Sequence, residues 1–382
     1  LAAADPTYAR LAFALLAGGF GVKAALLPMH SWLPDAMVAP TPVSGLLHAV
    51  AVVKSGVFGI ARVALEIFGP DAMGDLGVAL PLAAVATVTL LAASVLALRK
   101  DNLKRRLAYS TISQLSYIVL GLGLVGLATN PRTAIVGGLL HIPAHAFMKL
   151  TLFFCAGAIH AETHTDDISE MAGIGRRMPL TMTAFAIASA GMAGIPLLAG
   201  FVSKWYLLIG SVEAGYAVFA VALLVSGMLN IAYFWPVVYQ AFFERPGSHD
   251  EKPLVAGPYG GHFGRASTES ASSDSASTVR ASNGTVSPDC GDNVETGAVD
   301  ANRADSESPT GDVDRSDDGH HGGPPTEGWE RRNWRGGEST WFMLGPILAA
   351  AAGALLLGIV PGSVVFLDIV ETVAAAVVEG MP

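Results

Sequence analysis

Residues 134–159 read AIVGGLLHIPAHAFMKLTLFFCAGAI, a long apolar run that contains His141, His145 and Lys149. A transmembrane helix needs about 20 consecutive, mostly apolar residues, and this run is long enough. No alternation of apolar and polar residues, which would indicate a strand, competes with the helical interpretation. The stretch therefore predicts a helix that spans a membrane.

Similar apolar runs recur along the whole chain. Hydrophobic residues make up 52% of the sequence and charged residues 14%, against about 25% charged residues in soluble domains. Backbone groups in lipid must be satisfied internally, which favours helices. We therefore expect an all-α polytopic membrane protein with about eight or nine transmembrane helices, the ninth being also compatible with an interfacial helix. The expected spans are Leu11–Leu27, Val43–Phe68, Leu76–Leu98, Leu107–Leu127, Ala134–Ile159, Leu180–Ala199 continuing to Ile209, Tyr216–Phe243, Trp341–Val360 and Val364–Val378.

The negative charge is confined to one segment. Residues 246–339 carry 17 acidic and 8 basic residues, which accounts for the whole net charge of -9. This segment is also rich in Ser, Gly, Thr and Asn, a composition that cannot bury enough apolar surface to offset the entropy of ordering. We predict three parts: a transmembrane domain over 1–245, a disordered acidic insert over 246–339, and C-terminal transmembrane or interfacial helices over 340–382. The insert is either a regulatory tail or a solvated loop without a specific role.

The basic residues predict an orientation in the membrane. Arg99, Lys100 and 104–106 form the strongest basic cluster, and Arg176 and Arg177 fall on the same side two spans later. Basic loops face the cytoplasm, so both clusters and the acidic insert are expected there. The predicted location is the cell (plasma) membrane, with several passes. Because the chain has no initiator Met and opens almost directly into a helix, we expect a fragment that lacks earlier helices.

Ionisable residues inside the apolar runs are the most informative feature. Each costs at least about 2.5–3.5 kcal/mol at the bilayer centre, so it is retained mainly where it faces a partner or a polar cavity. The alternatives are a lysine that extends to the interface, and a histidine that is hydrogen-bonded in the core. The residues concerned are Lys23, His48, Lys54, His141, His145, Lys149 and Lys204.

The spacing of His141, His145 and Lys149 places them on one helical face. Residues four apart lie about 6 Å apart along a helix axis, so the three form a ladder of about 12 Å. Histidine exchanges protons near neutral pH, which suits such a ladder to proton transfer. A zinc site is the rival interpretation of two histidines at i and i+4. It lacks a third ligand nearby, and Pro143 lies between the histidines.

Proline and glycine residues predict interrupted helices near two of the lysines. Pro28 and Pro34 follow Lys23, and Pro196 precedes Lys204. A proline removes a backbone hydrogen bond and kinks or ends a helix. A pair of interrupted helices in corresponding positions of two halves indicates a transport pathway near the membrane midplane.

Four motifs together resemble a known family: KAALLPMHSWLPDAMVAPTPVSGLLHAVAVVKSGVFGIAR, RRLAYSTISQLSYIVLGLG, HIPAHAFMKLTLFFCAGAIHAETHTDDI and GMAGIPLLAGFVSKWYL. They are similar, in order and spacing over about Leu11–Phe243, to the antiporter-like proton-conducting subunits. These occur in Mrp-type sodium/proton antiporters, as their A and D subunits, and in the membrane arm of NADH:quinone oxidoreductase (complex I). The resemblance implies a fold of two inverted five-helix repeats with broken helices.

The resemblance also implies a role for each ionisable residue in a proton pathway. Lys23 corresponds to the lysine of the first broken helix, and Lys204 to that of the second, at the exit half-channel. A glutamate that normally pairs with the first lysine belongs to an earlier helix, which this chain does not contain. His48 and Lys54 correspond to titratable positions of one helix, and His141, His145 and Lys149 to those of the central relay helix.

We therefore expect a transporter subunit without a catalytic residue of its own. The first hypothesis is a subunit of a multisubunit monovalent cation (Na⁺)/proton antiporter, favoured by AETHTDDISEMAGIGRRMP and by the closeness of His48 and Lys54. The second is a proton-pumping subunit of a respiratory NADH or ferredoxin:quinone oxidoreductase, and the third is an assembly scaffold that transports nothing. Expected partners are the other subunits, protons, Na⁺ and the lipid bilayer.

No cofactor, metal or nucleic acid is expected. The chain has two cysteines and no CxxC, and its glycines lack the strand–turn–helix context of a nucleotide fingerprint. Acidic residues outnumber basic residues, 32 to 23, which argues against nucleic-acid binding.

Overall fold

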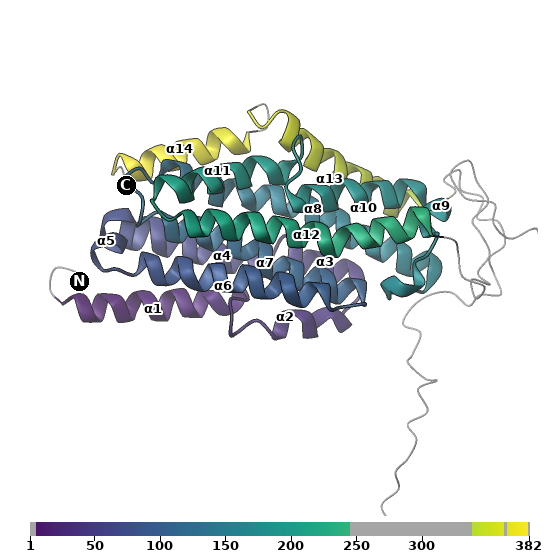
Figure 1. The fold of residues 1–382 in the computed structure, drawn as a ribbon, viewed down its shortest axis with the longest axis horizontal. Coiled ribbons are helices and arrows are strands. Elements are labelled where there is room, and N and C mark those ends of the chain that lie inside the picture. The colour runs from purple at the N-terminus through teal and green to yellow at the C-terminus, as the bar shows by residue number, and fades with distance from the viewer. Residues whose placement is uncertain (1–4, 245–337, 363–364, 381–382) are drawn as a thin grey trace, which may run out of the picture. The chain divides into compact units, whose positions relative to one another are not determined.

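The computed structural model describes residues 5–244, 338–362 and 365–380, and these residues form helices joined by short connections (Figure 1). The only β-type pairing among them is an isolated bridge between Asn102 and Asp167. The helices are α1 (Pro6–Lys23), α2 (Trp32–Asp35), α3 (Thr41–Ala49), α4 (Val52–Arg62), α5 (Gly69–Asp75), α6 (Ala79–Leu98), α7 (Leu103–Leu124), α8 (Arg132–Thr163), α9 (Ile174–Arg177), α10 (Pro179–Ala193), α11 (Ala199–Glu213), α12 (Ala217–Phe243), α13 (Trp341–Ile359) and α14 (Phe366–Val378).

Six helical segments of the described residues are long and apolar enough to cross a bilayer, as expected of a multi-pass membrane protein. The expected fold class is confirmed. Three expected spans, over Leu11–Leu27, Leu180–Ile209 and Val364–Val378, do not form helices of this length and composition. The region of Leu11–Leu27 forms α1, which contains Arg10 and Lys23, and the last span forms α14, a helix of 13 residues. The six segments are Thr41–Asp75, Ala79–Leu98, Leu103–Leu124, Arg132–Thr163, Ala217–Phe243 and Trp341–Ile359.

Two expected spans are interrupted. The span over Leu180–Ile209 divides into α10 and α11, as Pro196 predicts, with Gly194 and Leu197 at positive φ in the break. The span expected over Val43–Phe68 lies within the segment Thr41–Asp75, which is long and apolar enough to cross a bilayer, but its helix is not continuous. The helix breaks at Val50 and Ala51, continues as α4, and is π-helical over Val63–Phe68. No proline marks this second break, so the apolar pattern alone could not reveal it.

The inside of the bundle is more polar than its outside. α7 carries the polar run 110–116 in its middle, and nearly all of its residues are buried by other helices. Polar side chains in a membrane are tolerated when neighbouring helices satisfy their hydrogen bonds. α12 shows the opposite pattern on its outer face, where apolar side chains are exposed as lipid-facing residues require: Val218, Val221, Leu224, Met228, Ile231, Trp235 and Tyr239.

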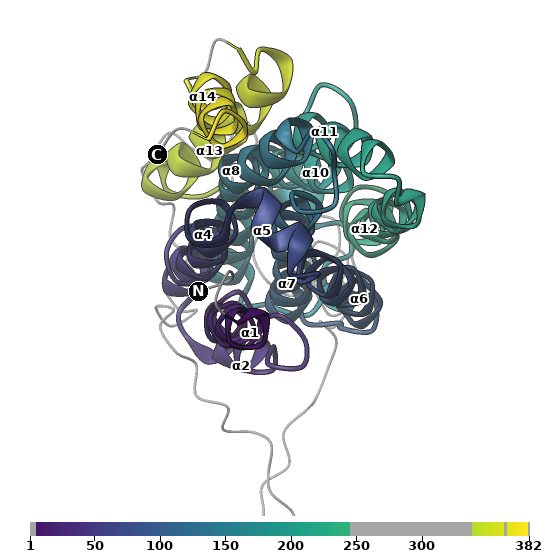
Figure 2. The same cartoon turned by 90° about the vertical axis from the view of Figure 1, so that its left-hand side faces the viewer.

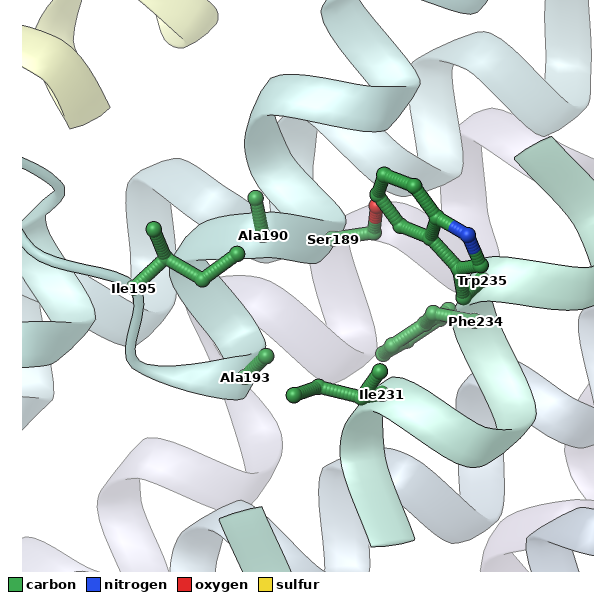
Figure 3. Close-up of a pocket in the computed structure, with 7 residues that line it drawn as sticks. All are labelled: Ser189, Ala190, Ala193, Ile195, Ile231, Phe234 and Trp235. Carbon is green, nitrogen blue, oxygen red and sulfur yellow. The ribbon is translucent and has the colours of Figure 1, made fainter. Parts of the chain in front are cut away.

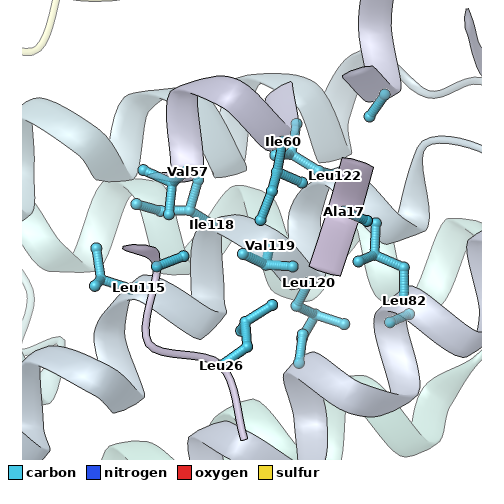
Figure 4. Packing of buried hydrophobic residues seen from close by; sticks show 14 of the residues in the cluster. Ala17, Leu26, Val57, Ile60, Leu82, Leu115, Ile118, Val119, Leu120 and Leu122 are labelled. Carbon is cyan, nitrogen blue, oxygen red and sulfur yellow. The ribbon is translucent and has the colours of Figure 1, made fainter. Parts of the chain in front are cut away.

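α8 lies in the interior and contacts α3, α7, α10, α11, α13 and α14 (Figure 2). α7 packs against α8 on one side and α6 on another. Figure 4 shows the apolar cluster between α4 and α7, in which Val57 and Ile60 pack with Ile118, Val119 and Leu122. The ionisable residues of α8 are therefore held inside a packed frame of helices.

Both basic clusters lie at one end of the molecule, as the orientation argument requires. Lys104 forms an ion pair with Asp166 at 3.0 Å, and the Leu103 amide donates to the Asp166 carbonyl at 2.8 Å. Ser169 donates to Asp101 at 2.6 Å in the same region. The loop before Arg176 and Arg177 is thus tied to the start of α7. That this end faces the cytoplasm stays a prediction.

The acidic insert over 246–339 lies outside the described residues except for its last two positions. Glu338 is buried, and its carboxylate accepts hydrogen bonds from the amides of Leu180 and Thr181 at 2.6 and 3.0 Å. Burial raises the pKa of the Glu338 carboxyl, and these hydrogen bonds act in the opposite direction. A carboxylate is favourable at the N-terminus of a helix. Glu338 therefore fixes the beginning of α13 to the beginning of α10.

Candidate functional site

The site is built on the middle of α8, where His141, His145 and Lys149 are all fully buried. The two imidazole rings are tilted toward each other with their centroids 6.1 Å apart. The three residues share one face because they are spaced by four residues on a continuous helix. The predicted ladder is therefore present in the structure, at the centre of the bundle.

Lys54 joins this ladder from α4. Its Nζ atom lies 3.0 Å from His145 Nδ1 and donates to the Ile142 carbonyl at 3.2 Å. Lys54 is the third residue of α4, directly after the break at Val50 and Ala51. The break begins a new helix next to α8, and the lysine at its start contacts α8.

Lys149 is held from the side of α7. Its ammonium donates to the Leu107 carbonyl at 2.8 Å and to the Ser110 hydroxyl. The rings of Phe153 and Phe234 lie beside it, each with its centroid 5.9 Å from Nζ. Aromatic faces attract a cation, so these four groups can hold the charged form without a carboxylate.

His141 is hydrogen-bonded through both ring nitrogens. Nδ1 lies 2.8 Å from the Ser203 hydroxyl of α11, and Nε2 lies 3.0 Å from Gln114 Oε1 of α7. The Tyr117 ring stacks on the imidazole with the centroids 5.5 Å apart. His141 thus connects α8 to α7 and to the helix that carries Lys204.

Lys204 reaches the site because the α10–α11 helix is broken. A residue normally donates to the carbonyl four positions earlier, but Pro196 has no N–H to give to Met192. The free Met192 carbonyl accepts from the Lys204 ammonium instead. The same ammonium lies 4.7 Å from the centroid of the Tyr117 ring. The end of α10 at Ala193 therefore leaves the Met192 carbonyl without a helical partner, and the Lys204 ammonium contacts it.

His48 lies at the edge of the group. It is fully buried in α3, and its ring faces that of Phe153 with the centroids 5.1 Å apart. Among the described residues neither of its ring nitrogens has a hydrogen-bond partner. His48 is thus linked to the lysine ladder through Phe153 and not by a direct polar contact.

The structure does not bring Lys23 to the other residues. Lys23 ends α1, and its side chain is exposed in the described chain. Pro28 lies in the irregular segment that follows α1, and Pro34 lies within the short helix α2. The broken helix is therefore seen at both expected places, whereas a role for Lys23 stays a prediction.

The site also contains several polar residues that were not predicted from the sequence. Gln114 contacts His141, and its amide nitrogen donates to Asn230 Oδ1 at 3.1 Å. The Tyr233 hydroxyl donates to the same Asn230 oxygen. A signal was available, because Gln114 and Asn230 are amides inside apolar runs and an unpaired amide in lipid is costly. The full set of additional residues is Ser110, Gln114, Tyr117, Ser203, Asn230 and Tyr233.

An apolar crevice lies beside the site but is not part of it. It has a volume of about 230 Å³ and opens between α10 and α12 (Figure 3). Figure 3 shows that Ser189, Ile195, Ile231 and Trp235 line it, and none of the buried lysines or histidines does. Its apolar lining suits contact with lipid and not the transfer of charge.

The electrostatics of the site favour sharing of protons. In the described part of the chain, none of Lys54, Lys149 and Lys204 forms an ion pair with a carboxylate. Two like charges about 4 Å apart repel by about 4 kcal/mol even at an effective dielectric constant of about 20. Lys54 and His145 therefore carry one positive charge between them far more readily than two. The described residues contain no group of three or more His, Cys, Asp or Glu that could hold a metal ion.

Comparison with known sequences identifies related membrane subunits. Residues 3–230 match the family described as NADH:quinone oxidoreductase/Mrp antiporter, TM. The chain is 39% identical over 252 residues to NADH-quinone oxidoreductase subunit N of Desulforudis audaxviator (strain MP104C), which covers 65% of this chain and 49% of that relative. It is 37% identical over 246 residues to a probable K(+)/H(+) antiporter A/B component of Rhizobium meliloti (strain 1021), over 63% of this chain and 24% of that relative.

Comparison with solved structures gives the same fold. A chain in the structure of the Mrp complex from Dietzia sp. DQ12-45-1b superposes with a TM-score of 0.69, covering 99% of this chain and 61% of that chain. The two sequences are 22% identical, so this likeness concerns the fold alone. The chain spans about half or less of the length of the two curated relatives.

Proposed function

Because the chain belongs to the NADH:quinone oxidoreductase/Mrp antiporter transmembrane family, we propose that it is a proton-translocating membrane subunit of a larger complex. The observation that carries the proposal is the contact of Lys54 with His145, within a buried ladder that also contains His141 and Lys149. Ionisable groups at membrane depth are costly and mark transport pathways and proton relays.

The mechanism follows from mutual repulsion of neighbouring cations. A proton taken up by Lys54 disfavours a second proton on His145, 3.0 Å away. Transfer along α8 toward Lys149, or toward His141 and Lys204, separates the charges again. Alternate occupation of these groups moves a proton between two openings of the pathway, and Lys204 lies nearest the broken helix expected to form the exit.

The finer assignment is a monovalent cation/proton antiporter, with Na⁺ as the cation. It is supported by the two titratable residues His48 and Lys54, buried on consecutive helical segments, and by the loop sequence over 161–179. A relative described as a probable K(+)/H(+) antiporter component is 37% identical to this chain. In this function a cation gradient drives proton movement in the opposite direction, within the plasma membrane and together with other subunits.

A second candidate is a proton-pumping subunit of a respiratory oxidoreductase. The supporting observation is the 39% identity to a NADH-quinone oxidoreductase subunit. Redox chemistry in partner subunits would then drive the same proton pathway. The two candidates differ in the driving force: addition of Na⁺ or K⁺ to vesicles drives proton movement in the antiporter, whereas an electron donor and a quinone drive it in the oxidoreductase.

The test is replacement of Lys54 and of Lys204 by alanine in the complete complex. We expect proton flux into everted membrane vesicles to fall about tenfold or more in each variant, since a barrier raised by about 1.4 kcal/mol has that effect. A pH-sensitive dye measures the flux, and immunoblotting of the membranes checks that the subunit is present. Lys100→Ala is the matched control, because Lys100 lies outside the transmembrane helices. Unchanged flux in both variants would instead support a scaffold.

A further inference from the structure

The donor and the acceptor of each hydrogen bond around His141 can be assigned. This assignment selects one of the two tautomers of the neutral imidazole. We infer that Asn230 and Gln114 hold neutral His141 with its hydrogen on Nε2, so that the transported proton is exchanged at Nδ1, against the Ser203 hydroxyl. Gln114 and Asn230 are then positioning residues for the proton pathway. The functional meaning of this inference rests on the proposed function, but the tautomer can be observed separately.

A backbone carbonyl of α12 fixes the orientation of the first side-chain amide, that of Asn230. Asn230 Nδ2 lies 2.7 Å from the Ser226 carbonyl, which can only accept a hydrogen bond. The amide group of Asn230 is therefore oriented with its nitrogen toward Ser226 and its oxygen toward α7. That oxygen accepts from the Tyr233 hydroxyl and from Gln114 Nε2.

Gln114 passes this orientation on to His141. Its Nε2 group donates to Asn230 Oδ1 at 3.1 Å and faces the Met192 carbonyl at 3.4 Å, so both hydrogens point to acceptors. Its remaining polar atom, Oε1, lies 3.0 Å from His141 Nε2 and can only accept. A hydrogen must therefore be carried by Nε2, because otherwise two buried acceptors would face each other with no hydrogen between them.

Ser203 can serve both protonation states of His141. When the imidazole is neutral, the Ser203 hydroxyl donates to Nδ1 across 2.8 Å. When a proton binds Nδ1, the new N–H donates to Ser203 Oγ, and the hydroxyl hydrogen turns to the Gly200 carbonyl, 3.3 Å away. One proton is gained and no hydrogen bond is lost, so uptake at Nδ1 requires only the rotation of a hydroxyl group. Nε2 keeps its hydrogen and its partner throughout.

The other titratable groups near His141 do not compete for Nε2. Tyr117 of α7 stacks on the face of the ring, and the His145 ring of α8 is 6.1 Å away between centroids. Lys204 of α11 and Lys54 of α4 bear on His141 through their charge. Both ammonium groups have their own backbone acceptors, at Met192 and Ile142. Among the described side chains, only the amide of Gln114 is hydrogen-bonded to Nε2.

The test is nitrogen NMR of the assembled complex, reconstituted with this subunit labelled with ¹⁵N-histidine. The shifts of the two ring nitrogens distinguish the Nε2–H form from the Nδ1–H form, and a His141→Gln variant assigns the His141 signals. We expect neutral His141 to be in the Nε2–H form. A dominant Nδ1–H form in the unmodified subunit overturns the inference, whatever the variants do.

Two variants then test the direction of the chain of hydrogen bonds. Asn230→Leu removes the nearer of the two acceptors that orient Gln114, at 3.1 Å against 3.4 Å for the Met192 carbonyl, so the Gln114 amide can turn its nitrogen toward His141, and we expect the Nδ1–H form to appear. Gln114→Glu in its protonated form keeps a carbonyl oxygen against Nε2 and directs its O–H to Asn230 Oδ1, so we expect the Nε2–H form to persist. A tautomer unaltered by Asn230→Leu overturns the proposed control by Asn230.

Flux measurements separate this inference from the proposed function. We expect Asn230→Leu to lower proton flux several-fold and to change its pH profile, because the exchanging nitrogen now faces Gln114 and not Ser203. If Lys54→Ala and Lys204→Ala leave flux unchanged while His141 is in the Nε2–H form, the proposed function fails and the tautomer assignment stands. If the lysine variants lose flux and His141 is in the Nδ1–H form, the reverse holds.

Discussion

Replacing Lys149 by methionine is expected to lower proton translocation to the level of vesicles that lack the complex. Methionine has a similar unbranched shape and no charge, so it fills the space without carrying a proton. The Leu107 carbonyl that loses the ammonium still accepts from the hydroxyls of Ser110 and Thr111, both at 2.9 Å. Folding should therefore survive, and the loss should concern transport alone. Dye-monitored proton uptake by everted vesicles is the measurement.

The control for this variant is Lys100→Met, which makes the same chemical change on a lysine between α6 and α7. Its ammonium lies 5.5 Å from the centroid of the Tyr109 ring, away from the ladder on α8. We expect full flux from the control and normal amounts of both variant proteins in the membrane. If Lys149→Met retained half of the wild-type flux or more, Lys149 would not be an obligatory carrier.

Replacing Gly200 by alanine is expected to destabilise the broken helix and to reduce flux. A Cβ atom on Gly200 would collide with the Gly191 carbonyl oxygen. Because this oxygen belongs to the backbone, no rotation of a side chain can relieve the collision. Overpacking of a tight interior typically costs about 1–3 kcal/mol. The strain falls on the contact between α10 and α11, so it also displaces Met192 from the Lys204 ammonium. The temperature at which the purified complex dissociates and the flux should both decrease.

Gly19→Ala provides the matched control, since it is the same substitution at a helical glycine with no atom within 4 Å of the added carbon. We expect the control to keep the dissociation temperature of the unmodified complex. Equal dissociation temperatures for Gly200→Ala and Gly19→Ala would show that the close approach seen at Gly200 relaxes at little cost.

Much of the fold could be predicted from the sequence because membrane helices follow from local composition. The apolar runs define the helices, and the i, i+4 spacing places His141, His145 and Lys149 on one face without knowledge of any neighbour. Pro196 predicts the break before Lys204 for an equally local reason. Such features need only the residues within one turn or two of the chain.

The remaining features depend on residues far apart in the sequence. The break after Val50 has no proline or glycine that would predict it. Its consequence, the contact of Lys54 with His145 of α8, depends on the packing of two helices. Gln114 and Asn230 are each isolated amides in the sequence, and their relation to His141 is a property of three helices packed together. Lys23 shows the same limit, since its apolar neighbourhood in the sequence could not reveal that its side chain is exposed among the described residues, and its role stays a prediction.

Lys54, Lys149 and Lys204 each donate to a peptide carbonyl, those of Ile142, Leu107 and Met192, and this has a consequence for energy storage. A peptide dipole neither binds nor releases a hydrogen ion, so it cannot neutralise an amine that has just gained one. In the proposed pathway, each proton that one of these amines takes up therefore adds a full elementary charge to the apolar interior. The potential of this charge acts on the next amine and favours the release of the proton that it carries.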